Sequence, residues 1–131
     1  MGLVSSLGIS ASGLSAERFR MDTIATNLAN INTVITPAGT PYRRQSVVFQ
    51  QTGQGGVRVG GVVQDSSAFR EEYNPSSPLA DKKTGIVSMP NVNPVTEMVD
   101  LIAASRAYEA NVTAFNAAKT MVLKALEIGK V

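Results

Sequence analysis

The feature that most limits the possible folds is the run of residues 95–128, which contains neither glycine nor proline. Asn93 and Pro94 stand directly before it and form a helix start signal. Asparagine can cap free amides there, and proline at the first helical position loses no hydrogen bond. Gly129 is a typical stop. The sequence therefore predicts one helix from Pro94 to Ile128, about 50 Å long and longer than a small domain is wide.

Apolar residues in this predicted helix recur every seven positions, as in the seam of a coiled coil. The two rows consist of Leu101, Tyr108, Phe115 and Val122, and of Met98, Val112 and Leu126 with interruptions at Ser105 and Lys119. The alternative is a plain amphipathic helix on a globular core. The length of the helix argues against that alternative, since ordinary globular helices run about 8–20 residues.

The first 33 residues repeat the same spacing. The main row consists of Leu7, Leu14, Met21 and Leu28, and it is flanked by Ala11, Ile24, Ala25 and Ile31. Three glycines fall in the first half of this segment. Each would weaken a helix by about 1 kcal/mol. We therefore expect a firm helix from about Ser15 to Ile31, with a less regular segment before it.

The middle of the chain holds most of the proline and glycine and is predicted to be strand and loop. Strands are expected within 42–51, 56–65 and 66–73, with Gly60-Gly61 as a turn or bulge and 74–85 as turns. Three short strands make at most a small sheet. The predicted fold is α+β, mainly α, with an N-terminal helix in 1–33, a β and loop region in 34–93 and a long C-terminal helix in 94–131.

The side chains that most often perform catalysis or bind metal are missing, because the chain has no histidine and no cysteine. The glycine-rich stretch 52–61 lacks the Gly-Lys-Ser/Thr of a phosphate loop. Glu71 and Glu72 are adjacent, so on a strand they would point to opposite faces. We predict that the protein is not an enzyme, and we assign no catalytic residue, cofactor or metal.

Charge and hydropathy exclude two further classes of partner. The net charge is only +2 and the basic residues are spread along the chain, which is not the clustered basic face of a nucleic-acid-binding protein. The basic pairs Arg43-Arg44 and Lys82-Lys83 are interpreted as solvated surface. No apolar run approaches the roughly 20 residues that span a bilayer. The start of the chain lacks the features of a cleaved secretory signal.

The polar faces of the two predicted helices carry uncharged groups. At helical spacing they present Thr23, Asn27 and Asn30 on the first helix, and Thr113, Asn116 and Thr120 on the second. Solvated helix faces usually carry abundant charge, whereas small and amide side chains suit close contact with other protein. We interpret these faces as contacts on more than one side. We also expect both terminal segments to be largely mobile in dilute monomer and to order on assembly.

Two functional hypotheses follow from the residues. The first is a subunit without catalytic activity that polymerises through head-to-tail contacts, which give an open helix. The second is a soluble monomeric adaptor or chaperone module whose long helix docks a peptide. The second would unfold in a sharp thermal transition, whereas the helix content of the first would rise with concentration.

Several segments resemble a known family. The stretch SGLSAERFRMDTIATNLANINT, residues 12–33, is similar to the N-terminal motif of bacterial flagellar rod and hook axial proteins. The stretches PYRRQSVVF and MPNVNPVTEMVDLIAASRAYEANVTAFNAAKTMVLKALEIGK, together with the Asn-Pro-Ser loop, resemble the proximal-rod members of that family. The chain differs from the family pattern at 34–45 and at Ser77, Leu79 and Ile86.

The resemblance implies a structural subunit of the flagellar basal-body rod. Such proteins are exported through the flagellar type III apparatus without signal cleavage and assemble into a helical tube across the periplasm. Their terminal helices form coiled coils in its wall. The implied partners are other rod subunits, further copies of the chain, the export apparatus and basal-body ring components, with no nucleic acid and no membrane span.

The seams, the amides and the resemblance together predict the residues of the assembly interface. On the first helix they are Leu14, Met21, Ile24, Asn27, Leu28, Asn30, Ile31 and Asn32. On the second they are Leu101, Tyr108, Asn111, Val112, Phe115, Asn116, Val122 and Leu126. We expect the amides to set the register between neighbouring subunits.

Overall fold

The computed structural model describes residues 2–130, which form two helices and two β-hairpins. Their order is α1 (Leu3–Ala29), β1 (Gln45–Gln51), β2 (Val57–Gln64), β3 (Arg70–Tyr73), β4 (Ile86–Met89) and α2 (Pro94–Ile128). The predicted α+β fold, mainly α, is confirmed. The outermost residues of the predicted terminal segments, Met1 and Val131, lie outside the described residues.

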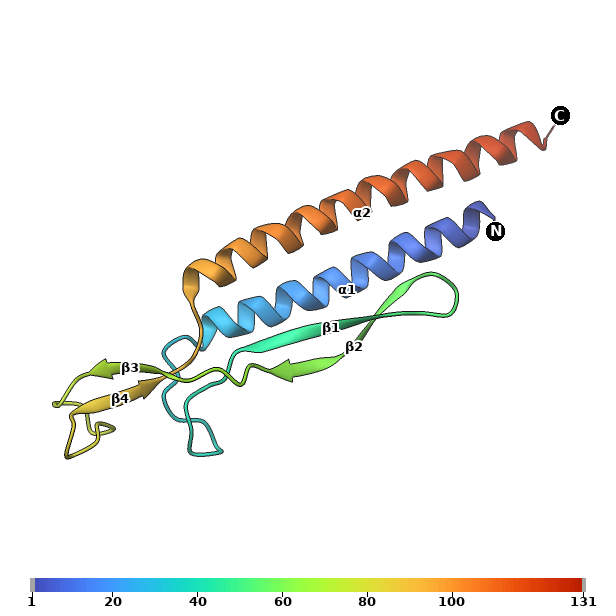
Figure 1. The fold of residues 1–131 in the computed structure, drawn as a ribbon. Coiled ribbons are helices and arrows are strands. Elements are labelled where there is room, and N and C mark those ends of the chain that lie inside the picture. Colours follow the sequence, from blue (N-terminus) through green and yellow to red (C-terminus); the bar gives the residue numbers. More distant parts are fainter. Residues whose placement is uncertain (1, 131) are drawn as a thin grey trace.

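The two helices run antiparallel, so the start of α1 and the end of α2 lie at the same end of the molecule (Figure 1). The β1–β2 hairpin packs along α1 on the side away from α2, which leaves α1 between the two (Figure 1). The β3–β4 hairpin lies at the opposite end of the molecule (Figure 1). The result is an elongated arrangement in which α1 is covered by α2 on one side and by the β1–β2 hairpin on the other (Figure 1).

The predicted limits of α2 are confirmed. Asn93 is the N-cap, and its Oδ1 accepts hydrogen bonds from the backbone N–H groups of Val95, at 3.0 Å, and Thr96, at 3.4 Å. Pro94 occupies the first turn, and the helix ends at Ile128 with Gly129 as its C-cap. With 35 residues, α2 is about 52 Å long.

Helix α1 begins at Leu3 and not near Ser15, so the expected irregular lead-in is absent from the described residues. Packing explains the difference. Gly13 is buried against α2, where an added Cβ would stand 3.0 Å from the side chain of Asn111. A glycine that looks like a helix breaker in the sequence thus allows close approach of the two helices, and the contacts formed there offset its poor propensity.

The end of α1 also differs slightly from the expectation, because the helix stops at Ala29 before reaching Ile31. The side-chain amide of Asn30 donates to the carbonyl oxygen of Thr26 at 2.8 Å. Asparagine bonds of this kind compete with the helical ladder. The crowding of asparagines at this point therefore ends the helix.

The β region contains two separate two-stranded antiparallel sheets rather than one small sheet. The expected bulge is confirmed: Val48 pairs with Gly61 and Phe49 with Val59, so that Gly60 is the additional residue. A Cβ at Gly60 would stand 2.5 Å from Gln50 Cγ, which explains the glycine. Strand β3 falls inside the predicted 66–73 segment, whereas β4 was not predicted because four residues are too few for a clear alternation.

The interior of the chain is unusual in composition. In the described part of the chain, the buried hydrophobic residues are Ala16, Ile24, Val87, Val92, Ala104 and Ala118, half of which are alanine. The largest side chains with under 2% exposure are those of Glu97, Asn27 and Pro90. The chain therefore buries small and polar groups and leaves many large apolar side chains at its surface.

Candidate functional site

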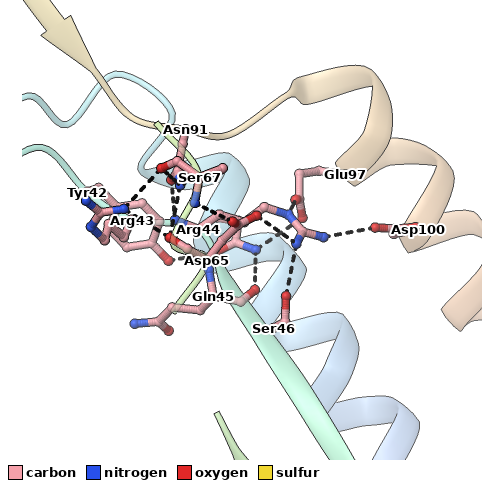
Figure 2. Close-up of polar contacts among 11 residues, drawn as sticks. Tyr42, Arg43, Arg44, Gln45, Ser46, Asp65, Ser67, Asn91, Glu97 and Asp100 are labelled. Carbon is pink, nitrogen blue, oxygen red and sulfur yellow. Dashed lines mark hydrogen bonds and ion pairs between the residues drawn. The ribbon is translucent and has the colours of Figure 1, made fainter. Parts of the chain in front are cut away.

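A polar cluster lies where five segments meet: the end of α1, the start of β1, the segment after β2, the β4–α2 connection and the first turn of α2 (Figure 2). Arg44 is at its centre. Its guanidinium donates from Nε to Glu97 Oε1 and from Nη2 to Asp100 Oδ2 at 3.2 Å. Its Nη1 donates to Ser46 Oγ at 2.9 Å and lies 3.8 Å from Asp65 Oδ2.

Two opposing effects act on the pKa of the Arg44 guanidinium. Burial lowers its pKa, but the hydrogen bond and charge of Glu97, with the charges of Asp100 and Asp65, raise that pKa by more. The Glu97 side chain has no exposed surface. A buried carboxylate is stable only when paired and hydrogen-bonded. The ion pair therefore ties the start of β1 to the first turn of α2.

The interpretation of Arg43-Arg44 as solvated surface was wrong. Arg44 is only 23% exposed at its side chain. The Arg43 guanidinium lies 4.2 Å from the centre of the Phe69 ring and donates to the carbonyl oxygens of Asp65 and Ser67, both at 3.1 Å. Arg43 thus holds the segment after β2, whereas Arg44 holds the first turn of α2, and their adjacency in the sequence does not reveal these roles.

Asn27 fills the other side of the cluster with four hydrogen bonds. Its Nδ2 donates to the Gln45 carbonyl oxygen at 2.8 Å and to Glu97 Oε2 at 3.1 Å. Its Oδ1 accepts from the Tyr42 hydroxyl at 2.8 Å and from the Gln45 N–H at 3.0 Å. The side chain that we assigned to contacts between subunits is thus fully hydrogen-bonded within its own chain and has 0% exposure.

Tyr42 and Asp65 of this cluster have shifted pKa values. Burial, with the nearby charge of Glu97, raises the pKa of Tyr42 above 10.0. The hydrogen bonds from the backbone N–H and side chain of Ser67 lower the pKa of Asp65 below 3.8, and the charges of Arg44 and Arg43 add to this. Both shifts favour the protonation states that these groups have at neutral pH.

Asn91 closes the cluster from the β4–α2 connection. Its Oδ1 accepts from the Arg44 N–H at 2.8 Å, and its Nδ2 donates to the carbonyl oxygens of Asp65 and Ser67, both at 3.2 Å. The cluster contains an arginine already surrounded by acceptors and no activated nucleophile. Among residues 2–130, no group of three His, Cys, Asp or Glu side chains is arranged to hold a metal ion. The arrangement can fix segments in place, and we assign it that role.

Sequence reasoning assigned no role in this cluster to Tyr42, Arg44, Asp65, Asn91, Glu97 or Asp100. One signal was available. Glu97 stands seven residues before Ala104, on the face of α2 that includes Asn111 and Ala118. A carboxylate in line with buried alanines predicts a buried charge, and such a charge needs a cationic partner elsewhere in the chain.

The structure distributes the predicted assembly residues over three environments. Buried residues are Ile24 and Asn27. Half-buried residues are Leu14, Met21, Leu28, Asn30, Ile31, Leu101, Tyr108, Asn111, Val112, Phe115 and Val122. Exposed residues are Asn32, Asn116 and Leu126. Gly13 on α1 lies against Asn111 on α2, so this amide faces a contact within the chain.

Apart from the polar cluster, many exposed apolar side chains lie on α2. Near its start are Val95, Met98, Val99 and Ile102, and near its end are Met121, Leu123, Leu126 and Ile128. Each is at least 52% exposed, and Ile128 reaches 76%. Neither helix within the described residues is long and apolar enough to cross a membrane. Contiguous exposed apolar surface of this kind marks a site of contact with other protein or with membrane.

Two family descriptions match the chain at its two ends. Residues 7–34 match "Flagella basal body rod protein" and residues 83–128 match "Flagellar basal body rod FlgEFG protein C-terminal". The flagellar basal-body rod protein FlgC of Borreliella burgdorferi is 44% identical, over 98% of this chain and 98% of its own. The FlgC proteins of Bacillus subtilis and Yersinia enterocolitica are 43% and 45% identical, over 95% and 99% of this chain and 97% and 100% of their own.

The chain belongs to the FlgC family of flagellar basal-body rod proteins. The two matched stretches contain nearly all of α1 and all of α2, together with β4. They leave the whole β1–β2 hairpin and β3 unmatched. The family descriptions therefore coincide with the helix pair on which the exposed apolar side chains lie.

Proposed function

We propose that this FlgC-family chain builds the basal-body rod by joining neighbouring subunits through the outer faces of α1 and α2. The observation that carries the proposal is the inversion of the usual burial pattern. Among residues 2–130, three of the six buried hydrophobic residues are alanines, while Met98, Ile102 and Leu126 are 56%, 57% and 60% exposed. Burying a side chain of this size contributes about 1.5–3 kcal/mol, so a neighbouring subunit that covers several of them gains a large stabilisation.

The proposed interface differs from the set expected from the sequence. Asn27 and Ile24 are omitted because both are buried within the chain. The exposed residues Asn32, Asn116 and Leu126 are kept, and the half-buried seam residues contribute only their outer edges. The apolar residues added from the structure are Val95, Met98, Val99, Ile102, Met121, Leu123 and Ile128.

The assembly is proposed to be head-to-tail, with α1 and α2 in the wall of a helical tube. An elongated subunit with different surfaces along its length favours such heterologous contacts, which do not close into a ring. The proposed partners are further copies of this chain, other rod subunits, the export apparatus and basal-body rings. Export without signal cleavage and a location across the periplasm belong to the same proposal, supported by the family membership.

A role without catalysis is also proposed. The acidic side chains of the central cluster are engaged by Arg44, Asn27 and Ser67, which leaves them poorly placed to act on a substrate. The relatives are named as basal-body rod proteins. The cluster is assigned to holding the two hairpins and α2 in a fixed relation to α1, so that the outer helix faces are presented together.

The test replaces exposed apolar residues of α2 by aspartate in cells that lack their own FlgC. Leu126→Asp and Ile102→Asp are expected to abolish incorporation into basal bodies, because each places a charge in the buried interface. Leu28 would be a less suitable target, since it is half-buried and its substitution would also disturb folding. Incorporation is measured by immunoblotting of purified basal bodies.

Val48→Asp is the matched control, because Val48 is an exposed apolar residue on β1, outside the two helices. It is expected to leave incorporation unchanged. Circular dichroism of the purified variants confirms that each one is folded. Normal incorporation of both α2 variants would refute the proposed interface and would favour a monomeric adaptor or chaperone module.

A further inference from the structure

Methionine supplies all the sulfur of this chain, which has five methionines and no cysteine. Four of them, Met21, Met89, Met98 and Met121, lie among the residues that the structure describes. Peroxides oxidise the methionine thioether to a sulfoxide, and a thioether that faces solvent reacts before one that other side chains shield. The exposure of each methionine therefore determines which of them an oxidant modifies first.

The four described methionines form two pairs that differ in exposure. Met98 and Met121, both on α2, are 56% and 52% exposed. Met21 on α1 and Met89 on β4 are half-buried. The same chain thus presents two thioethers to an oxidant in solution and shields two others in part, which provides an internal comparison for any oxidation experiment.

Each exposed methionine belongs to a row of exposed aliphatic side chains along α2. Val95, Met98 and Ile102 follow one another at three- and four-residue spacing, so they share one face of the helix. Met121 and Ile128 stand seven residues apart, which also places them on a common face. Both thioethers are therefore part of the α2 surface that is proposed above to contact neighbouring subunits.

Oxidation by hydrogen peroxide would change the chemistry of this surface. The sulfur lone pair forms a bond to one peroxide oxygen, the O–O bond breaks, and the proton on the transferred oxygen moves to the departing hydroxide, which leaves as water. Sulfur is oxidised by two electrons and the peroxide is reduced by two. The sulfoxide is polar where the thioether was apolar. The aliphatic side chains of each row have no donor for its oxygen, and burying a polar group without a hydrogen bond is costly.

We propose that Met98 and Met121 are modification sites, at which oxidation to the sulfoxide by peroxide blocks assembly of the free chain. A chain already in the rod is protected, because its neighbours cover both thioethers. Methionine sulfoxide reductases can reverse the modification. The proposal rests on the proposed rod function and adds to it a chemical control of the same α2 surface.

Peptide mass spectrometry after brief treatment with hydrogen peroxide tests the two sites. In the purified free chain, Met98 and Met121 should be oxidised at least about fivefold faster than Met21 and Met89, because solvent reaches them. In purified basal bodies, the rates at Met98 and Met121 should fall at least about fivefold, because buried thioethers are shielded. Equal rates at all four methionines of the free chain, or unchanged rates for the α2 pair in basal bodies, would overturn the proposal.

Incorporation in cells treated with sublethal hydrogen peroxide tests the consequence. For each variant, the chain in purified basal bodies is compared with that of untreated cells expressing the same variant. Peroxide should lower incorporation of the natural chain at least about fivefold, since the buried sulfoxides lack donors. The double variant Met98→Leu, Met121→Leu should lose less than about twofold, because leucine has a similar volume and no sulfur. Met89→Leu, outside both helices, is the matched control and should remain as sensitive as the natural chain.

Glutamine substitutions test the same step without an oxidant. Glutamine is unbranched, like methionine, and carries an acceptor oxygen, like the sulfoxide. Met98→Gln with Met121→Gln should lower incorporation at least about fivefold. Val48→Gln, at an exposed position on β1, should leave incorporation unchanged.

The outcomes separate this inference from the proposed function. Normal incorporation of the double glutamine variant, or equal peroxide sensitivity of the double leucine variant and Met89→Leu, would overturn the oxidation sites alone. Failure of the proposed function would appear elsewhere, as normal incorporation of Leu126→Asp and Ile102→Asp.

Discussion

The two ends of the helix pair differ in which side chains they bury and which they expose. At the junction, where α1 ends and α2 begins, Asn27 and Glu97 are buried and hydrogen-bonded to Arg44, Tyr42 and Gln45. Toward the far end of α2, the buried position is Ala118, while Met121, Leu123 and Leu126 are exposed. The junction satisfies its polar groups within one chain, whereas the far end leaves its apolar groups uncovered.

The comparison distinguishes contacts that stabilise the single chain from exposed apolar side chains that are available to neighbouring subunits. Polar networks specify one arrangement because every member must find its partner. Alanines allow close helix contact but contribute little burial, since each removes little apolar surface from water. We therefore expect the junction to be the most stable part of the isolated chain and the far end of α2 to gain most from assembly.

The largest expected effect tests the junction. Glu97→Gln leaves the Arg44 charge without its buried partner and should lower the free energy of unfolding by about 3 kcal/mol. Urea denaturation of the purified chain measures it. Glu127→Gln is the control, because Glu127 pairs with Lys124 at 3.0 Å but is 65% exposed. It should cost less than about 0.5 kcal/mol. Equal losses of unfolding free energy for the two variants would show that the buried Glu97 pair contributes no more than an exposed pair.

A smaller difference is expected in the local stability of α2. Backbone amides in 119–128 should exchange with solvent at least about tenfold faster than those in 97–104 in dilute monomer, because few contacts oppose local opening there. Hydrogen exchange followed by mass spectrometry measures this, and the difference should shrink in assembled rods. Strong protection across 100–125 in the monomer would contradict both this gradient and the predicted mobility of the terminal segments.

The smallest effect concerns Asp65 at the edge of the junction. Because its pKa lies below the ordinary value of 3.8 in the folded chain, its contribution to stability is present above that pH. It is lost as the pH falls through the lower, folded value. The stability gap between the natural chain and Asp65→Asn should therefore be largest near neutral pH and narrow in acid. Urea denaturation at several pH values measures the gap, and a gap independent of pH would refute this role.

The helices were largely predictable because their signals are local. Asn93, Pro94 and Gly129 mark the ends of α2 through capping chemistry that depends on neighbouring residues alone. The Gly60 bulge was predictable for the same reason. The start of α1 was not, because Gly13 reads as unfavourable until Asn111 is seen against it. The contact that decides its role joins residues far apart in the chain.

The candidate site was also predictable only in part. Apolar spacing predicted two helix faces for contact with protein, and that assignment stays a proposal. The junction was missed because Arg44, Asp65, Asn91 and Glu97 are scattered over the sequence and only folding brings them together. Asn27 shows the limit most clearly. Its amide indicated hydrogen bonding to other protein groups, but the sequence could not tell whether these groups belong to the same chain or to a neighbouring subunit.

The sequence by itself determined the limits of α2, the helical character of the first segment, that the middle is strand and turn, and that the chain resembles flagellar axial proteins. Helical periodicity, capping and turn chemistry operate over a few residues, so they can be read without a structure. Only the tertiary structure decided which polar groups are internal, that Glu97 pairs with Arg44, and which apolar side chains stay exposed. Burial and electrostatic pairing depend on distances between remote segments, and the linear order of residues does not contain them.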